Sequence, residues 1–259
     1  KKLKKRPPPE FCLSKANHLN SAFTLAEVLI TLGVIGVVAA MTMPSLITNY
    51  QKKQTLKQLR ASYTTLAQVF ERAKVEYGDI DTWILNDLQG QSTSISSAKL
   101  TETIVQTYFL PYISYTKDHG ITTFEDIGIT IKGLDNEKAT DGYYIGKYYI
   151  VELVNGSIIG FRMDTGCNGG YDSEGNCNNP VYTSLAFTVD INGYKKPNTL
   201  GKDIFCMRMQ DNKFEFYVNS GIKNNRTSLL RNCSKEYTKE NRQCGRLIEY
   251  DGWEINYDW

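Results

Sequence analysis

The most prominent pattern along the chain is an uncharged apolar run near its start. No residue from 28 to 51 carries a charge. As a helix, the 23 residues 25–47 would extend about 34 Å, more than the roughly 30 Å of a bilayer's hydrocarbon core. We therefore predict that residues 23–47 form one membrane-spanning helix.

Past Pro44 the apolar positions recur every three or four residues, which predicts that the helix continues as an amphipathic segment over residues 48–77. The stripe consists of Leu56, Leu59, Tyr63, Leu66, Phe70, Ala73 and Tyr77. We expect it to pack on the chain's own globular part, and a free two-stranded coiled coil is the alternative. Pro44 has no N–H to donate, so we expect a kink or local melting over residues 41–44. Gly33 and Gly36 would let other helices approach closely.

Residues 78–259 read as a globular domain. A shorter helix is predicted over 98–109, ended by Pro111. Aromatic and β-branched runs predict strands at 143–153, 157–163, 182–190, 203–209 and 213–218, with turns at Asn155-Gly156 and Asp211-Asn212. The predicted fold class is α+β, a long N-terminal helix packed on an antiparallel sheet.

Charge is distributed unevenly along the chain. Residues 1–22 hold six of the 30 basic residues and one of the 28 acidic ones, so the remainder is net −3. Basic residues before an apolar span favour the cytoplasmic side, which would place the globular domain outside the cytoplasm. The basic segment is a leader, and the acidic remainder gives no reason to expect direct nucleic-acid binding.

Glu27 lies almost at the start of the apolar run, where a carboxylate is costly in free energy unless a partner compensates its charge. A secretory signal peptide cleaved after Ala40 and a plain signal anchor both leave it unexplained. Cleavage between Ala22 and Phe23 would free an α-amine one helical turn from Glu27. That cation could neutralise Glu27 within one chain or in a neighbouring copy, which would make Glu27 a device for setting register in an assembly.

These residues resemble a known family. The stretch from Ala22 to Ile30, AFTLAEVLI, looks like the class III signal of type IV prepilins and of type II secretion pseudopilins. Gly36 and Pro44 match positions where that family commonly has Gly and Pro. The family usually has Gly before the cut, where this chain has Ala22.

The resemblance implies a pilin-like fold, removal of residues 1–22, N-methylation at Phe23, and a role for Glu27 in docking subunits. Its implied partners are identical or related pilin subunits, a prepilin peptidase, an assembly platform and the membrane. It also implies a single-pass protein of the bacterial inner membrane that then enters a pilus or pseudopilus.

Five of the six cysteines follow the apolar run. The spacings of Cys167 with Cys177 and of Cys233 with Cys244 are those of short disulfide-closed loops, which suit an oxidising compartment. Other pairings remain open. Cys206, among apolar neighbours, reads as a buried thiol.

One loop offers oxygen atoms that calcium could use. Residues 189–205, VDINGYKKPNTLGKDIF, are similar to a loop between sheet strands of pseudopilin-like chains and favour the pseudopilin branch of the family. Its weak candidate ligands are Asp190, Asn192, Asn198 and Asp203, although Asn192-Gly193 also suits a turn and no EF-hand spacing is present. The loop of residues 167–177 could likewise hold a cation or be a solvated surface loop, and the solvated loop is the favoured interpretation. Its polar residues are Asp172, Glu174 and Asn176. We expect no cofactor, with calcium the one alternative.

Catalytic patterns are absent from the sequence. There is no Walker loop, dinucleotide glycine pattern, HExxH or CxxC. His18 lies in the leader, and His119 reads as a solvated loop residue without a nucleophile partner. We therefore expect a structural subunit of a filament rather than an enzyme. The alternative is a monomeric, membrane-anchored binding or adhesion protein that would use the aromatic sheet and the Cys167 loop.

Overall fold

The computed structural model describes residues 24–80, 82, 83, 97–140, 146–167, 180–218, 225–237 and 241–259. The chain forms two compact units, residues 1–49 and residues 50–259. Helix α1 (Leu25–Tyr77) begins in the first unit and ends in the second. It is helical throughout residues 41–44, with Pro44 inside it, so the local melting expected there does not occur.

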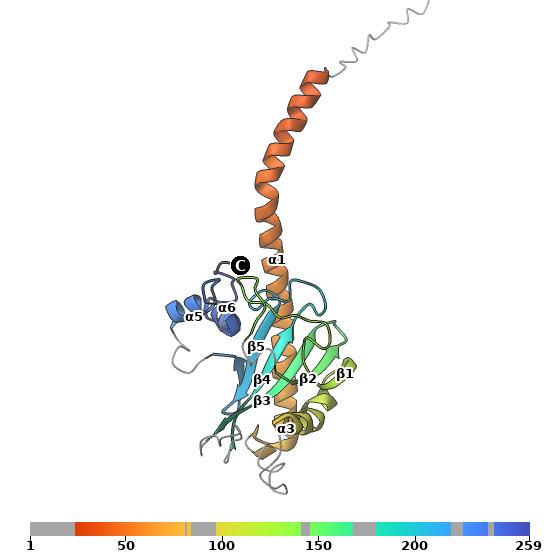
Figure 1. The fold of residues 1–259 in the computed structure, drawn as a ribbon, viewed down its shortest axis with the longest axis vertical. Helices are drawn as coiled ribbons and strands as arrows, with labels where there is room; N and C mark the ends of the chain where they lie inside the picture. Colours follow the sequence, from red (N-terminus) through yellow and green to blue (C-terminus); the bar gives the residue numbers. More distant parts are fainter. Residues whose placement is uncertain are drawn as a thin grey trace, which may run out of the picture. The chain divides into compact units, whose positions relative to one another are not determined.

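A six-stranded sheet forms the centre of the second unit (Figure 1). Its strands follow one another in chain order, and each pairs antiparallel with the next. They are β1 (Tyr115–Thr122), β2 (Tyr148–Leu153), β3 (Ile158–Cys167), β4 (Pro180–Asp190), β5 (Ile204–Gln210) and β6 (Lys213–Phe216). Turn residues enable the tight connections: Gly156, Asp211 and Asn212 all have positive φ. Together with α1, this sheet confirms the predicted α+β fold.

Short helices complete the unit. Helix α3 (Ser97–Ile104) continues into the π-helix η1 (Val105–Phe109) and the 3-10 turn η2 (Leu110–Tyr112), and it packs against β3 and β2. Near the C-terminus lie α5 (Arg226–Asn232), the 3-10 turn η4 (Asn241–Gln243) and α6 (Cys244–Tyr250). In Figure 1, α5 and α6 lie together beside β5.

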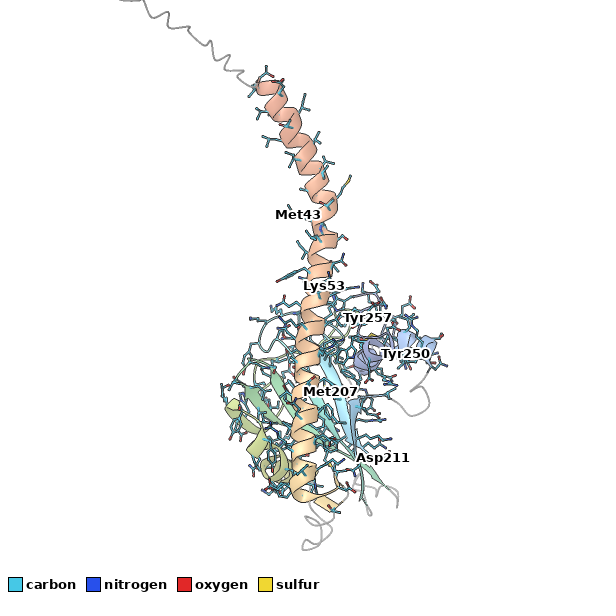
Figure 2. All side chains as sticks on the ribbon, turned by 180° about the vertical axis from the view of Figure 1, so that it is seen from behind. Met43, Lys53, Met207, Asp211, Tyr250 and Tyr257 are labelled. Atoms are coloured by element: carbon cyan, nitrogen blue, oxygen red, sulfur yellow. A yellow bond between two sulfur atoms is a disulfide. The ribbon has the colours of Figure 1, made fainter. Side chains whose placement is uncertain are left out.

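The part of α1 within the second unit packs on one face of the sheet. Phe187 of β4 and Met207 of β5, which are cross-strand partners, share a core with Leu66 and Phe70 of α1. Figure 2 shows α1 crossing this face at Met207. The helix is therefore docked on its own chain, as the amphipathic stripe predicted.

The buried face of α1 differs in detail from the predicted stripe. Its buried residues recur every three or four positions, with Val69 and Phe70 adjacent: Thr55, Leu59, Ser62, Leu66, Val69, Phe70 and Ala73. Tyr63 and Leu56 pack at the side of this face and are only partly buried. Small polar side chains, Thr55 and Ser62, thus occupy two of the buried positions.

The opposite face of the sheet has a second core, covered by the segment after β1. Phe124 packs there against Tyr148, with ring centroids 5.3 Å apart. Gly160 makes this contact possible, because a Cβ at that position would lie 2.7 Å from the Phe124 ring. The sheet is thus buried on both faces.

Several predicted elements were wrong or incomplete. Strand β1 and helices α5 and α6 were missed, and β2 begins at Tyr148 rather than at 143, with residues 141–145 outside the described part. Strand β1 is an edge strand with two register irregularities, and its first four residues are exposed and its last four half-buried, so it lacks the alternation that reveals a half-buried strand.

Candidate functional site

The N-terminal part of α1 is apolar on all sides. None of the described residues 24–49 is buried, and Leu29 and Ile35 are 61% and 63% exposed. Figure 2 shows side chains radiating from the helix around Met43. By length and composition, α1 can cross a membrane. A helix apolar all round needs lipid or other helices around it.

The start of this helix is closed by a capping box. The backbone N–H and the hydroxyl of Thr24 both donate to Glu27 Oε2, each at 2.8 Å, and the Glu27 N–H donates to Thr24 Oγ1 at 3.2 Å. This reciprocal pattern satisfies amide groups that the first helical turn leaves without partners. The predictions from the sequence did not include this cap, although Thr-x-x-Glu before an apolar run is its signature. Glu27 therefore has a local structural role that cleavage is not needed to explain.

Two glycines and two threonines characterise the described part of the predicted assembly segment and its continuation. A Cβ built on Gly33 or Gly36 would meet nothing within 4 Å, so both glycines leave open surface. The hydroxyls of Thr42 and Thr48 donate to carbonyls one turn earlier, which keeps them satisfied in an apolar surrounding. Ala22 and Phe23 lie outside the described residues.

The loop between β4 and β5, residues 191–203, contains three of the four weak metal candidates, and the fourth, Asp190, is the last residue of β4. Asp203 accepts hydrogen bonds from the Asn198 N–H at 2.8 Å, from the Thr199 N–H at 2.6 Å and from Asn192 Nδ2 at 3.1 Å. Asp190 accepts one from the Asn192 N–H at 3.1 Å. Two carboxylates therefore organise this loop, one at each end.

Both carboxyl groups are buried, and their pKa values reflect it. Burial, followed by the nearby Asp203 charge, raises the pKa of Asp190 to about 8, while hydrogen bonds from the Asn192 and Gly193 backbone oppose that rise. Burial also raises the pKa of Asp203, against the hydrogen bonds that it accepts. The loop thus holds two acidic groups for which ionisation is costly.

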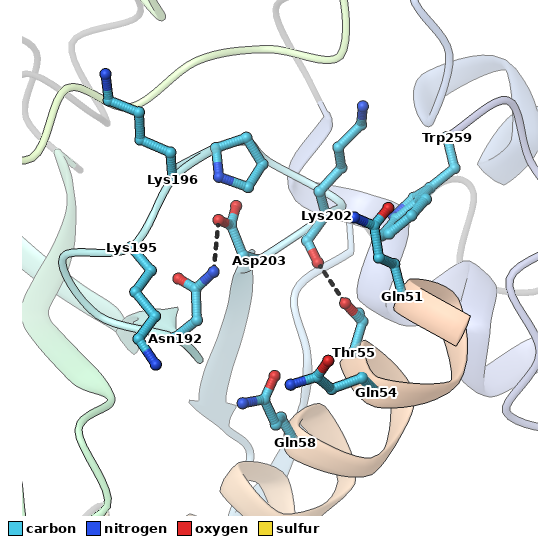
Figure 3. Close-up of a pocket in the computed structure, with 11 residues that line it drawn as sticks. Gln51, Gln54, Thr55, Gln58, Asn192, Lys195, Lys196, Lys202, Asp203 and Trp259 are labelled. Atoms are coloured by element: carbon cyan, nitrogen blue, oxygen red, sulfur yellow. Dashed lines mark hydrogen bonds between the residues drawn. The ribbon is translucent and has the colours of Figure 1, made fainter. Parts of the chain in front are cut away.

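A polar pocket lies beside this loop (Figure 3). One wall is formed by amide side chains of α1, among them Gln54 and Gln58, and the other by Asn192 and Asp203. Thr55 donates a hydrogen bond to the Lys202 carbonyl at 3.2 Å. This bond ties the loop to the docked part of α1.

The C-terminal end supports the same loop. The Tyr257 hydroxyl and Trp259 Nε1 both donate to the Gly201 carbonyl, the second at 3.2 Å. Farther back along the chain, Cys233 and Cys244 form the disulfide that their spacing predicted, and it joins α6 to the end of α5.

The remaining cysteine and acidic candidates are placed as follows. Cys206 is buried and takes part in no disulfide. Cys177 lies outside the described residues, as do Asp172, Glu174 and Asn176, and the side chain of Cys167 is not described.

The prediction that His119 is a solvated loop residue was wrong, because His119 lies in β1. Its side chain is 10% exposed, and Nε2 lies 2.6 Å from Glu152 Oε1. The Tyr194 hydroxyl donates to the same oxygen at 2.5 Å. The hydrogen bond from Tyr194 is the largest cause of the lowered pKa of Glu152, and the contact with His119 lowers it further. Within the described ranges, no group of three or more His, Cys, Asp or Glu side chains is placed to hold a metal ion.

Comparison with known proteins defines a family but no relative of known function. Searches of curated proteins and of solved structures found no match. A model of a family of unknown function, DUF6613, matches residues 45–259, the part of the chain that follows Pro44. Because this match covers most of the chain, the protein belongs to the DUF6613 family.

Proposed function

We propose that this protein is a structural subunit of a type IV pilus-like or type II secretion pseudopilus filament. In this proposal the chain is cleaved before Phe23, N-methylated there, and assembled through the apolar part of α1. The observation that carries it is the position of Glu27, a carboxylate in the first turn of α1, whose N-terminal part is otherwise uncharged and apolar on every side.

The exposed apolar surface supports assembly. A lone spanning helix is satisfied by lipid, but small residues such as Gly33 and Gly36 add nothing to lipid contact. They lower the cost of bringing helix backbones together. A bundle of such helices would give each one a partner and leave the second units on the outside.

The capping box refines the role of Glu27. It satisfies the first amides of the helix and still leaves a full negative charge near apolar surroundings. Because Thr24 is the residue before the helix, an amine freed at Phe23 would directly precede the cap. That amine could then neutralise the carboxylate of its own chain or of a neighbour.

The pseudopilin branch is the version we favour. The loop of residues 189–205 resembles that of pseudopilin-like chains, and the chain after residue 22 is net −3. A negative surface repels phosphate backbones, so direct DNA binding is not part of the proposal.

The first test is the mass of the mature N-terminal peptide, purified from native membranes. A peptide that begins with N-methylated Phe23 is the expected result. Protein that keeps residues 1–22, or that begins at Met41, would refute processing of this type and favour an anchored monomer.

The second test separates charge from capping at Glu27. Glu27→Gln keeps the capping box, since Gln is accepted at that position, but removes the charge. Thr24→Ser keeps both and serves as the control. We expect Glu27→Gln to insert into the membrane but to lose filaments, measured by electron microscopy and by the sheared surface fraction. Normal filaments in Glu27→Gln would show that the carboxylate acts only as a cap.

A further inference from the structure

Lysine side chains gather where α1 enters the second unit. Lys52 and Lys53 lie in the first turn of α1 within this unit, and Lys196 and Lys202 lie in the loop between β4 and β5. None of the four makes an ion pair with an acidic side chain of the described ranges. We call these four lysines, together with Trp259, the entry surface.

The acidic side chains near this surface leave its charge largely uncompensated. Two of them act on Lys202: Asp203 is only 3% exposed, and Asp258 is already paired with Lys235 at 2.8 Å. Burial, followed by the charge of Lys235, lowers the pKa of Lys202, although both acids act in the opposite direction. The entry surface would therefore be stabilised by an additional anion.

The ammonium groups of the loop extend toward the N-terminal side of α1. In Figure 3, α1 runs from Gln58 to Gln51 toward its N-terminal end, and Lys196 and Lys202 extend to the Gln51 side. Gln51 is four residues after Ile47, the end of the predicted membrane span, which is about 6 Å of helix. The entry surface thus belongs to the end of the second unit from which the apolar run continues.

An indole ring completes the entry surface. Lys202 Nζ lies 5.6 Å from the centroid of the Trp259 ring, and Trp259 Nε1 donates to the Gly201 carbonyl at 3.2 Å. This hydrogen bond fixes the ring beside the loop, where it is only partly buried. Tryptophan is favoured at the interface between membrane and water, because its ring suits the apolar boundary and its N–H suits the headgroups.

Anionic phospholipid headgroups fit this surface. Their phosphate groups supply the missing negative charge, and basic segments next to a membrane span are attracted to them. The amide groups of Gln51 and Gln54, which line the polar pocket beside the loop, can donate to phosphate oxygens. A second copy of the chain would have to offer a concentrated acidic patch, whereas insertion of α1 by itself brings headgroups close to residues 52 and 53.

We propose that the entry surface contacts the anionic phospholipid headgroups of the membrane that α1 spans. The contact holds the second unit at the bilayer, and it weakens when salt screens the charges. The inference rests on the membrane insertion of α1 that the proposed function includes, but it does not require filaments.

The test uses the full chain in liposomes, made of phosphatidylcholine alone or with about 30 mol% phosphatidylglycerol. A small fraction of lipid with a nitroxide on its headgroup quenches tryptophans at the interface. The quenching of Trp259 is the difference between the wild type and Trp259→Phe, since the other two tryptophans are common to both. We expect it to be at least about twofold stronger with phosphatidylglycerol and to return to the neutral-lipid level in about 0.5 M sodium chloride.

Charge variants show whether the response comes from the entry surface. Lys196→Gln with Lys202→Gln should remove at least about half of the increase produced by phosphatidylglycerol, because each lysine near an anionic surface contributes to the attraction. Lys196→Arg with Lys202→Arg keeps the charge and should keep the response. The matched control is Lys147→Gln with Lys213→Gln, two exposed lysines at the starts of β2 and β6, the end of the sheet opposite the β4–β5 loop. This control should respond like the wild type.

Flotation in alkaline carbonate reports separately whether α1 is inserted. If the chain floats but Trp259 quenching is the same in both lipids, or is undiminished by the two glutamines, the headgroup contact is refuted and the filament proposal is untouched. Quenching that follows the protein-to-lipid ratio instead of lipid charge would also overturn the contact and would place a second copy on this surface. A chain that does not float would overturn both this contact and the membrane-spanning part of the proposed function.

Discussion

Replacing Leu66 by alanine tests whether the second half of α1 is held by the sheet. Leu66 is 1% exposed and belongs to the same core as Phe187 and Met207. Truncation to alanine removes three carbon atoms from a site enclosed by helix and sheet. Val75→Ala on the same helix is the matched control, since Val75 is 88% exposed.

The expected magnitude follows from burial. A buried leucine replaced by alanine costs roughly 2–5 kcal/mol, because transfer free energy is lost and a cavity remains. For a unit of this size, about 2–4 °C of Tm corresponds to 1 kcal/mol, so a loss of about 3 kcal/mol lowers Tm by about 6–12 °C. Val75→Ala should change stability by less than about 0.5 kcal/mol, since it removes no buried contact.

Urea unfolding of the full chain in detergent, followed by tryptophan fluorescence, measures both variants. Trp83 is a suitable reporter because it is 1% exposed and its ring centroid lies 6.3 Å from that of Phe70 on α1. If Leu66→Ala were no less stable than Val75→Ala, α1 would not be docked on the sheet in solution, and the packing argument would fail.

Three further predictions use the second unit. Reduction of the disulfide between Cys233 and Cys244, 11 residues apart, should cost about 3 kcal/mol by restoring loop entropy to the unfolded chain, measured by urea unfolding with and without reductant. Gly193→Ala should lower the free energy of unfolding by about 2–4 kcal/mol, because φ is +65° and a Cβ would lie 2.2 Å from a backbone carbonyl oxygen. Gly128 also has positive φ but lies in open space, so Gly128→Ala, measured by the same urea unfolding, should cost only about 1–2 kcal/mol. The hydrogen-bonded guanidinium of Arg226, on α5, lowers the pKa of the Asp251 carboxyl. The stabilisation from this pair should therefore be complete above about pH 4 and should be lost as the pH falls further. Measured from about pH 6 to about pH 2.5, the Tm of Arg226→Gln should fall less than that of the wild type.

The long helix and most of the sheet could be predicted from the chain because their signals are local. The spacing of Leu59, Leu66 and Ala73 marks the docking face, and aromatic and β-branched runs mark the central strands. Strand β1 could not be found in this way. None of its residues is fully buried, and it is a strand because β2 offers it an unpaired edge.

The two candidate sites also differ in how much of each could be predicted from local sequence. The motif around Glu27, including the capping box that could have been recognised from Thr24 and Glu27, is contained within four residues of sequence. The calcium hypothesis could be raised from Asp190 and Asp203 in one loop. The burial of both carboxyl groups depends on segments far away in the chain.

The apolar span, the amphipathic continuation of α1 and the α+β class could be read from the chain alone, because each depends on spacing between near neighbours, and the same kind of spacing made Cys233–Cys244 a candidate disulfide. The packing of distant segments places Thr55 and Ser62 in the buried face of α1, pairs His119 with Glu152, and buries both Asp190 and Asp203. Burial and hydrogen bonding depend on which distant residues meet, and no local pattern records that.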